Sequence, residues 1–208
     1  MKVLVVGGGG REHALVWKIR QSSMVTEVYC APGNGGISQL AQCVDIPATD
    51  IDSITKFAVK NNIDLAVVAP DDPLALGAVD KLEEKGIRAF GPSKAAAAIE
   101  GSKVFAKDLM KKYGIPTAPY RVFDNFVDAR EYITTCCSFP VVIKADGLAL
   151  GKGVIIAKDK GEAVEALDNM MVKKIFNQAG QRVVIEQFIT GPEVSLLAFT
   201  DGETVLPM

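Results

Sequence analysis

The sequence predicts an α/β protein in which a doubly wound parallel sheet is followed by a second, smaller α+β domain. Over the first 120 residues, short apolar runs alternate with helix-like segments, which is typical of parallel strands joined by crossover helices. The first run, Val3–Val6, is continuously apolar, as expected of a strand that is covered on both faces. Beyond residue 120, strand-like runs follow one another through loops, which favours an α+β arrangement.

The elements of the first part are predicted in order. Strands are expected over 2–6, 27–31, 64–69 and 87–90, and helices over 11–21, 52–61 and 74–85. Loops rich in glycine follow the first two strands, at Gly7–Gly10 and Pro32–Gly36. Residues 93–113 are expected to form two helical pieces broken near Gly101-Ser102, and 114–119 to form a hinge.

The second part is predicted to contain more strands than helices. Strands are expected over 120–123, 140–145, 154–157, 182–187, 194–200 and 204–206, and helices over 126–135 and 161–176.

The composition of the 208 residues excludes several classes of function. Hydrophobic residues make up 49% and charged residues 23%, as in an ordinary soluble globular protein. A net charge of −2 without a block of like charges gives no electrostatic basis for binding nucleic acid. The apolar run before Gly7 is too short for a signal peptide, and no stretch reaches the roughly 20 apolar residues of a membrane helix. We therefore expect a cytoplasmic protein without nucleic-acid or membrane partners.

The cysteines and the single histidine restrict the chemistry further. Four cysteines without a C-x-x-C pair indicate reduced thiols. One histidine excludes a metal site with two histidines, and any Ser-His-Asp hydrolase would depend on His13 alone. We interpret His13 as a structural residue at the start of a helix rather than an acid–base group.

The loop Gly7–Gly10 lies between the first strand and the first helix, where a doubly wound fold presents backbone N–H groups and a positive helix end to anions. It is not a dinucleotide fingerprint, because G-x-G-x-x-G requires glycine where the chain has Glu12 or His13. No acid ends the second strand to bind a ribose either. The loop therefore indicates a small phosphate-bearing ligand, the alternative being a tight turn without a ligand.

A second glycine loop follows Lys144 and contains Gly147, Gly151, Lys152 and Gly153. It departs from the P-loop, because only three residues separate the first two glycines and a strand follows instead of a helix. Flexible glycines between two lysines are suited to close over a polyphosphate. The alternative is a solvated hairpin tip.

The segment Val184–Ile189 reads as a strand that ends near an acid, Glu186. Its extended backbone can hydrogen-bond an adenine edge, and Glu193 lies a short turn further on, where it can meet a ribose. Taken alone, Glu186 is also compatible with a surface acid at a strand end, and Phe188 with an ordinary core residue.

Seven strings occur in one order along the chain: Gly9–Ala14, Ala31–Asn34, Phe90–Ala96, Glu100–Lys103, Val142–Gly147, Gly151–Val154 and Val205–Met208. They resemble the phosphoribosylamine–glycine ligase family, also called glycinamide ribonucleotide synthetases, within the ATP-grasp superfamily. The resemblance spans the entire chain. It implies the ATP-dependent joining of glycine to 5-phosphoribosylamine in purine biosynthesis, giving glycinamide ribonucleotide, ADP and phosphate through a glycyl phosphate.

The resemblance also implies a domain organisation. An N-terminal substrate-binding (pre-ATP-grasp) domain would span 1–119, the small α+β ATP-grasp lid 120–191, and the first strands of the main ATP-grasp body 192–208.

Binding residues are implied in the same way, and no catalytic residue is assigned. The ATP-binding set would be Lys103, Lys144, Gly147, Gly151, Lys152, Gly153, Glu186, Gln187, Ile189 and Glu193. The substrate-binding set would be Gly9, Gly10, Arg11, Glu12, Asn34 and Asp71. Ligands for Mg²⁺ or Mn²⁺ are expected downstream of Met208. Phosphoryl transfer depends chiefly on positioning and charge neutralisation, so a chain with one histidine can support it.

Two departures from the family pattern matter. The chain reads Ala69-Pro70-Asp71 where the family commonly has Gly-Pro-Glu, which leaves an acid one methylene shorter. The chain also ends at Met208 whereas the family continues, so we expect an incomplete portion with little or no ligase activity by itself. The oligomeric state stays open.

Three alternatives remain. Another ATP-grasp carboxylate–amine ligase or carboxylase would share the features of residues 144–193 but differ in its substrate loops. A non-catalytic nucleotide-binding module would suit the short length. A nicotinamide-dependent oxidoreductase is disfavoured by the failed fingerprint, and tight binding of NADH would revive it.

Overall fold

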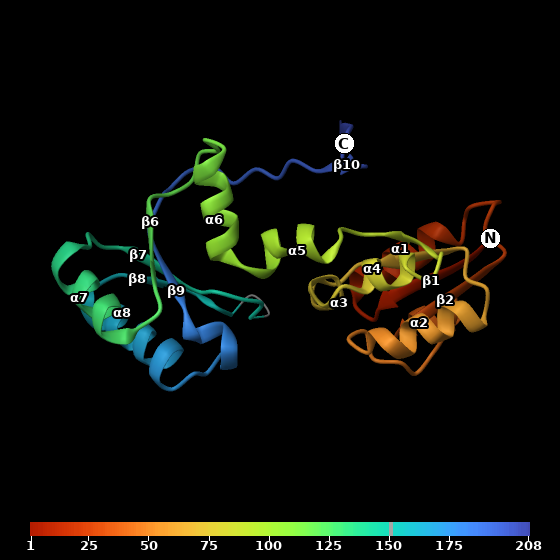
Figure 1. Ribbon diagram of the computed structural model, residues 1–208, viewed down its shortest axis with the longest axis horizontal. Helices are drawn as coiled ribbons and strands as arrows, with labels where there is room; N and C mark the ends of the chain where they lie inside the picture. The colour runs from red at the N-terminus through yellow and green to blue at the C-terminus, as the bar shows by residue number, and fades with distance from the viewer. Residues whose placement is uncertain (150–151) are drawn as a thin grey trace.

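The computed structural model of the protein describes residues 1–149 and 152–208. Two lobes are joined by two consecutive helices, α5 (Lys94–Gly101) and α6 (Lys103–Lys112) (Figure 1). One lobe contains a five-stranded parallel sheet and the other a four-stranded antiparallel sheet. The predicted fold class, a doubly wound sheet followed by a smaller α+β lobe, is confirmed.

The first lobe alternates strands and helices. Its strands are β1 (Lys2–Gly7), β2 (Glu27–Pro32), β3 (Gln42–Cys43), β4 (Leu65–Val68) and β5 (Arg88–Phe90). Its helices are α1 (Gly10–Ile19), α2 (Ile51–Lys60), α3 (Asp71–Leu76) and α4 (Ala78–Glu83), with a 3-10 turn at Ile37–Gln39. The strand order is β3-β2-β1-β4-β5, so the chain moves outward on one side of β1 and then on the other.

The continuous apolar run of β1 is explained by cover on both faces. Leu4 and Val6 belong to a core cluster that α2 and α4 complete, whereas Val3 and Val5 belong to a second cluster with Val16 of α1. All four β1 side chains are at most 1% exposed. A strand whose two faces are both buried has no polar position, which is why its sequence does not alternate.

The second lobe packs its helices on one face of its sheet. Its strands are β6 (Tyr120–Phe123), β7 (Val141–Ala145), β8 (Val154–Ala157) and β9 (Val183–Gln187), in the order β6-β9-β7-β8. Its helices α7 (Phe126–Cys136) and α8 (Lys160–Leu167) bury Ile133 and Leu167 against the sheet. Neither α7 nor α8 covers the opposite face of the sheet, which carries Lys144 and Glu186.

The last segment returns toward the first lobe. Beyond β9 the chain runs in extended form past α5 and α6 (Figure 1) and ends in a hairpin of β10 (Ala198–Thr200) and β11 (Val205–Pro207). Phe199 of this hairpin meets Phe90 of β5 edge to face, with ring centroids 6.4 Å apart. Within the described residues, no helix is long and apolar enough to cross a membrane.

Several predicted elements differ from the structure. The helix expected over 74–85 is two helices, α3 and α4, because Gly77 between them takes a left-handed conformation (φ 91°). The helix expected over 161–176 ends at Leu167 and continues as a π-helical turn over Asp168–Val172. Only Ala198–Thr200 of the strand expected over 194–200 is paired, and β3 was not predicted. The domain bounds at 119 and 191 stay predictions.

Candidate functional site

The first glycine loop is packed too tightly for any other residue at two of its positions. Gly7 has φ +123°, and a Cβ on it would lie 2.6 Å from Glu12 Cγ and 2.8 Å from Pro70 Cγ. A Cβ on Gly8 would lie 2.6 Å from the carbonyl oxygen of Gly33. The loops that follow β1 and β2 therefore meet with backbone in contact at the carboxyl edge of the parallel sheet, and the Pro70 ring after β4 packs against Gly7.

This edge is also where the strand order reverses. The chain leaves β1 toward β2 on one side and later occupies β4 on the other, so the loops after β1 and β4 diverge and leave a crevice between them. Open α/β sheets bind ligands at such a switch point. Residues 9–12 and 69–72 flank it, and both segments line one cavity of about 600 Å³.

Two of the predicted substrate residues use their side chains to shape the loop. Glu12 is 6% exposed, and its carboxylate accepts a hydrogen bond from the Gly9 N–H at 2.5 Å. Asn34 donates to the Gly8 carbonyl oxygen at 2.8 Å. Its Oδ1 also accepts from two backbone N–H groups of its own turn, each at 2.9 Å. These contacts position the backbone N–H groups of the loop.

Arg11 is placed differently. It is exposed at the start of α1, and its guanidinium makes no hydrogen bond or ion pair with any described residue. It lines the 600 Å³ cavity together with Asp71. The complete lining is Gly9, Gly10, Arg11, Glu12, Ala69, Pro70, Asp71, Asp72, Glu100, Lys103, Gly147, Leu148, Ala149 and Val154. The structure thus brings predicted substrate residues together with Lys103 and Gly147 of the predicted ATP set.

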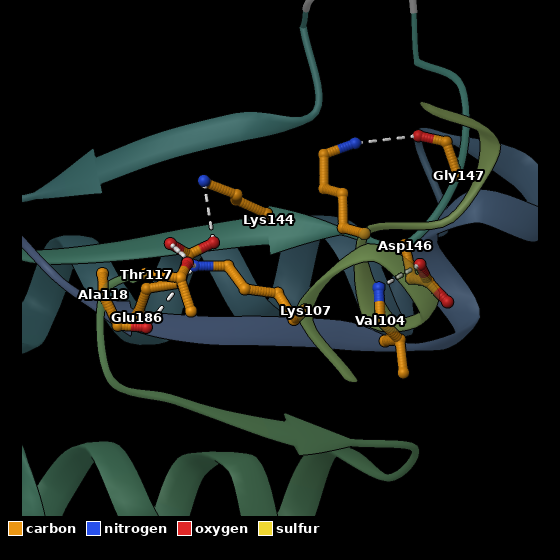
Figure 2. A network of polar contacts seen from close by, with 9 residues as sticks. Val104, Lys107, Thr117, Ala118, Lys144, Asp146, Gly147 and Glu186 are labelled. Atoms are coloured by element: carbon orange, nitrogen blue, oxygen red, sulfur yellow. Dashed lines mark hydrogen bonds and ion pairs between the residues drawn. The ribbon is translucent and has the colours of Figure 1, made fainter. Parts of the chain in front are cut away.

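The second glycine loop is tied to the start of α6 (Figure 2). Lys103 Nζ donates to the Gly147 carbonyl oxygen at 3.0 Å. Asp146 Oδ1 accepts from Ser102 Oγ at 2.9 Å and from the Val104 N–H at 3.1 Å. Its Oδ2 accepts from Nε of Arg182 at 2.7 Å, and Nη2 of the same guanidinium is also in contact.

Asp146 is ionised at neutral pH although its side chain is buried. Burial opposes ionisation, but the hydrogen bonds from the Val104 N–H, from Arg182 and from Ser102 outweigh it and hold the pKa of Asp146 below its ordinary value. The loop is therefore anchored through one carboxylate to the start of α6 and to Arg182, the residue before β9.

Glu186 is buried between two lysines (Figure 2). Its side chain is 5% exposed, with Lys107 Nζ 2.8 Å from Oε2 and Lys144 Nζ 2.7 Å from Oε1. Sequence considerations alone left a surface acid possible here; burial and two ion pairs exclude it. The register places Val142, Lys144 and Glu186 on one face, opposite the face that α7 and α8 cover.

That face also has apolar residues beside the charges. Val154 and Ile156 of β8 pair with Lys144 and Val142, and are 44% and 51% exposed. An apolar strip next to a few placed polar groups is the usual make-up of a site for a small aromatic ligand. The residues present here therefore fit a nucleotide base with its phosphates toward the glycine loop.

Lys144 and Glu186 do not line the 600 Å³ cavity, and neither do Lys152, Gly153, Gln187, Ile189 and Glu193. Gln187 is exposed, Ile189 is 66% exposed, and Glu193 lies in the exposed segment before β10. Lys152 is exposed, and its N–H bonds the Ala149 carbonyl oxygen at 2.9 Å. The carbonyl oxygen of Gly153 accepts from the Ala145 N–H at 2.8 Å, which closes the hairpin. Gly151 lies outside the described residues. Over 1–149 and 152–208, no group of three His, Cys, Asp or Glu side chains is arranged to hold a metal ion.

Comparison with known proteins identifies the family. Residues 1–100 match the model "Phosphoribosylglycinamide synthetase, N domain", and residues 101–208 match "Phosphoribosylglycinamide synthetase, ATP-grasp (A) domain". The chain belongs to the phosphoribosylglycinamide synthetase family. The predicted family resemblance is confirmed.

Individual relatives agree with this assignment. A phosphoribosylamine–glycine ligase of Caldanaerobacter subterraneus is 53% identical over 208 residues, which are 100% of this chain and 50% of the relative. The crystal structure of the Thermotoga maritima phosphoribosylamine–glycine ligase superimposes with a TM-score of 0.81 at 34% identity, over 100% of this chain and 49% of that one. The chain spans about half the length of the curated relatives it matches.

The fold extends to other enzymes. The biotin carboxylase domain of the Hydrogenobacter thermophilus 2-oxoglutarate carboxylase, solved with MgADP and bicarbonate, has a TM-score of 0.71 at 20% identity. That likeness covers 90% of this chain and 44% of that one, and it shows a shared fold.

Three residues of the candidate site were not predicted from the sequence: Lys107, Asp146 and Arg182. Lys107 carried a signal, since it lies four residues after Lys103 and so on the same face of a helix. Asp146 lies inside a recognised string. Arg182 carried none, because its partner is 36 residues away.

Proposed function

We propose that this chain supplies the phosphoribosylamine site and much of the nucleotide site of a phosphoribosylglycinamide synthetase. The whole protein would use ATP to ligate glycine to 5-phosphoribosylamine, giving glycinamide ribonucleotide, ADP and phosphate. The observation that carries the proposal is the single cavity in which Arg11 and the first glycine loop face Lys103 and Gly147. Both family models support it. A cytoplasmic location remains part of the proposal.

The sugar phosphate would bind at the switch point of the parallel sheet. There the first glycine loop opens α1, a helix of 10 residues whose N-terminus carries partial positive charge. Arg11 adds a full charge, and a guanidinium fits a phosphate with two parallel hydrogen bonds. Asp71, across the cavity, is suited to accept from a sugar hydroxyl or the amine.

ATP would lie between the open face of the second sheet and the glycine loop. Val142, Val154 and Ile156 offer an apolar surface to adenine, and Lys144 and Lys103 offer charge to the phosphates. A phosphate oxygen at Lys103 would replace the Gly147 carbonyl that this lysine now contacts. The fold neighbour crystallised with MgADP supports a nucleotide in this fold.

The reaction itself would proceed in two displacements. A carboxylate oxygen of glycine attacks the γ-phosphorus of ATP and ADP leaves, which gives glycyl phosphate. The amine of phosphoribosylamine then attacks the carbonyl carbon, phosphate leaves and the nitrogen loses a proton. The residues of this chain hold and neutralise the phosphates. Mg²⁺ or Mn²⁺ would accompany ATP, but the described side chains form no metal centre, so no step is assigned through the ion.

The test is the ligase assay on the full-length protein, with Arg11→Met as the probe. Losing a charged contact to phosphate, worth about 1.5–3 kcal/mol, raises the KM for phosphoribosylamine roughly tenfold or more. The KM values for ATP and glycine stay unchanged. Arg130→Met, at an exposed position of α7, is the matched control and leaves all three values as they are.

Two results would contradict the proposal. One is a full-length protein that forms no ADP in the presence of both glycine and phosphoribosylamine. The other is an Arg11→Met variant with an unaltered KM for phosphoribosylamine. For residues 1–208 alone we expect little or no ligase activity, measured as ADP formation that requires both co-substrates.

A further inference from the structure

The two lysines that contact Glu186 have different surroundings. Lys107 is 8% exposed, and its ammonium group donates to Glu186 Oε2 at 2.8 Å, to Thr117 Oγ1 at 2.7 Å and to the Ala118 carbonyl oxygen at 3.4 Å. A lysine ammonium has three N–H donors. All three therefore have acceptors within the protein, and Lys107 has none left for a ligand.

Lys144 has capacity that Lys107 lacks. Its side chain is 27% exposed and lies on the open face of the sheet. Its one carboxylate contact, to Glu186 Oε1 at 2.7 Å, does not have hydrogen-bond geometry, and Oε1 is buried without a hydrogen-bond partner among the described residues. Lys144 thus engages the carboxylate with at most one of its three donors, and the others can turn to a nucleotide.

The charges of the three groups explain why both lysines are needed. Glu186 with Lys144 alone is a neutral pair, and the lysine would be drawn fully onto the carboxylate. Lys107 adds a second positive charge at the other carboxylate oxygen of Glu186 and leaves the trio with a net charge of +1. A buried carboxylate with one partner removed is strongly destabilising, so Glu186 requires a fixed cation.

We propose that Lys107 is a positioning residue of the nucleotide site: it neutralises and orients Glu186 through Oε2, so that Lys144 at Oε1 keeps donors for the nucleotide. This inference rests on the proposed function, because it assumes that a nucleotide binds on this face. Lys107 also links Thr117 and Ala118, and with them the connection from α6 to β6, to β9, one of the two central strands of the second sheet.

The experiment compares ATP binding by calorimetry, and the KM values for ATP and glycine, in the full-length protein. The variants are Lys107→Met, Glu186→Gln and the double variant, with Lys111→Met as control, since Lys111 is exposed one turn further along α6. Lys107→Met is expected to weaken ATP binding and raise the KM for ATP about tenfold, the effect of about 1.4 kcal/mol. The KM for glycine and the Lys111→Met variant stay unchanged.

The double variant separates positioning from simple structural support. Because Glu186→Gln removes the carboxylate that would hold Lys144, the double variant is expected to bind ATP more tightly than Lys107→Met and nearly as tightly as Glu186→Gln. If Lys107→Met does not fold, the comparison of Glu186→Gln with the double variant still tests the proposal, because the double variant leaves no buried charge unpaired. A tenfold loss between Glu186→Gln and the double variant would mean that Lys107 contacts the nucleotide itself, and would overturn the proposal.

Failure of this inference is distinguishable from failure of the proposed function. A wild-type protein that binds no ATP contradicts the function. A wild-type protein that binds ATP, with a Lys107→Met variant that binds it equally well, contradicts the role of Lys107 alone.

Discussion

Replacing Asp146 by asparagine is expected to release the glycine loop of the second lobe from α6. The substitution preserves shape, and Oδ1 can still accept from the Val104 N–H. It removes the charge that Arg182 contacts and turns an amide N–H₂ toward the guanidinium, so that donor faces donor. The Lys103 contact to Gly147, the next residue, loses its support at the same time.

The magnitude follows from the four hydrogen bonds that Asp146 accepts. Hydrogen bonds to charged groups contribute about 1.5–3 kcal/mol each when buried. The Asp146 side chain is 5% exposed but Arg182 is 47% exposed, so solvent screens the ion pair and its net value lies well below a buried one. We expect the free energy of unfolding to fall by about 2 kcal/mol, mostly through the groups left without a proper partner.

Urea denaturation followed by circular dichroism measures this change, and with a slope near 2 kcal/mol per molar the midpoint falls by about 1 M. Asp124→Asn, an exposed aspartate in the same lobe, is the control and stays within about 0.5 kcal/mol of the wild type. Equal midpoints for the Asp146 and Asp124 variants would refute the anchoring role of Asp146.

Three further predictions concern glycines and pH. Gly8→Ala is expected to lower the free energy of unfolding by about 1–3 kcal/mol, because its Cβ would lie 2.6 Å from the Gly33 carbonyl oxygen. Gly10→Ala has open space around its Cβ and is expected to change the stability little, so thermal unfolding distinguishes the two variants. Gly147 has φ +152°, and a Cβ on it would lie 2.7 Å from the Cβ of Ala179, so Gly147→Ala is expected to distort the loop. We expect the KM for ATP to rise and the KM for glycine to stay unchanged, and an equal rise in both would contradict this prediction. Since the pKa of Asp146 is lowered on folding, its contribution is present above the ordinary value of about 3.9 and is lost as pH falls through the folded value. The stability difference between the wild type and Asp146→Asn is therefore expected to vanish in acid titrations, and a difference that persists there would contradict this account.

Local sequence patterns were sufficient for much of the fold. The strands over 120–123 and 154–157 were predicted with the bounds that the structure shows, and the break between α5 and α6 near Ser102 was predicted as well. In each case the determining signal lies within the segment: an apolar run bounded by turn residues, or a capping serine. The break at Gly77 was missed, because an isolated glycine within a helical pattern usually continues the helix.

The candidate site was predictable where its residues lie in loops with a distinctive pattern. The glycine loops after β1 and β7 were found in this way. The burial of Glu186 was not, because it depends on Lys107, which is 79 residues earlier, and on which strand pairs with β9. Contacts between residues so far apart in sequence depend on the topology of the sheet, and no local sequence pattern predicts them.

The position of β9 has a consequence for the order in which the protein folds during synthesis. The parallel sheet has all its strands once residue 90 has been made, so the first lobe can form early. In the other sheet β9, one of the two central strands, is the last in sequence. It is the partner of β6, so residue 187 must be made before the sheet can be completed. Pairing over such separations is slow, because the closure of a long loop precedes the contacts that compensate for it. Until then β6 has no partner strand and one edge of β7 is unpaired, and unpaired strand edges make an incompletely folded chain prone to aggregation.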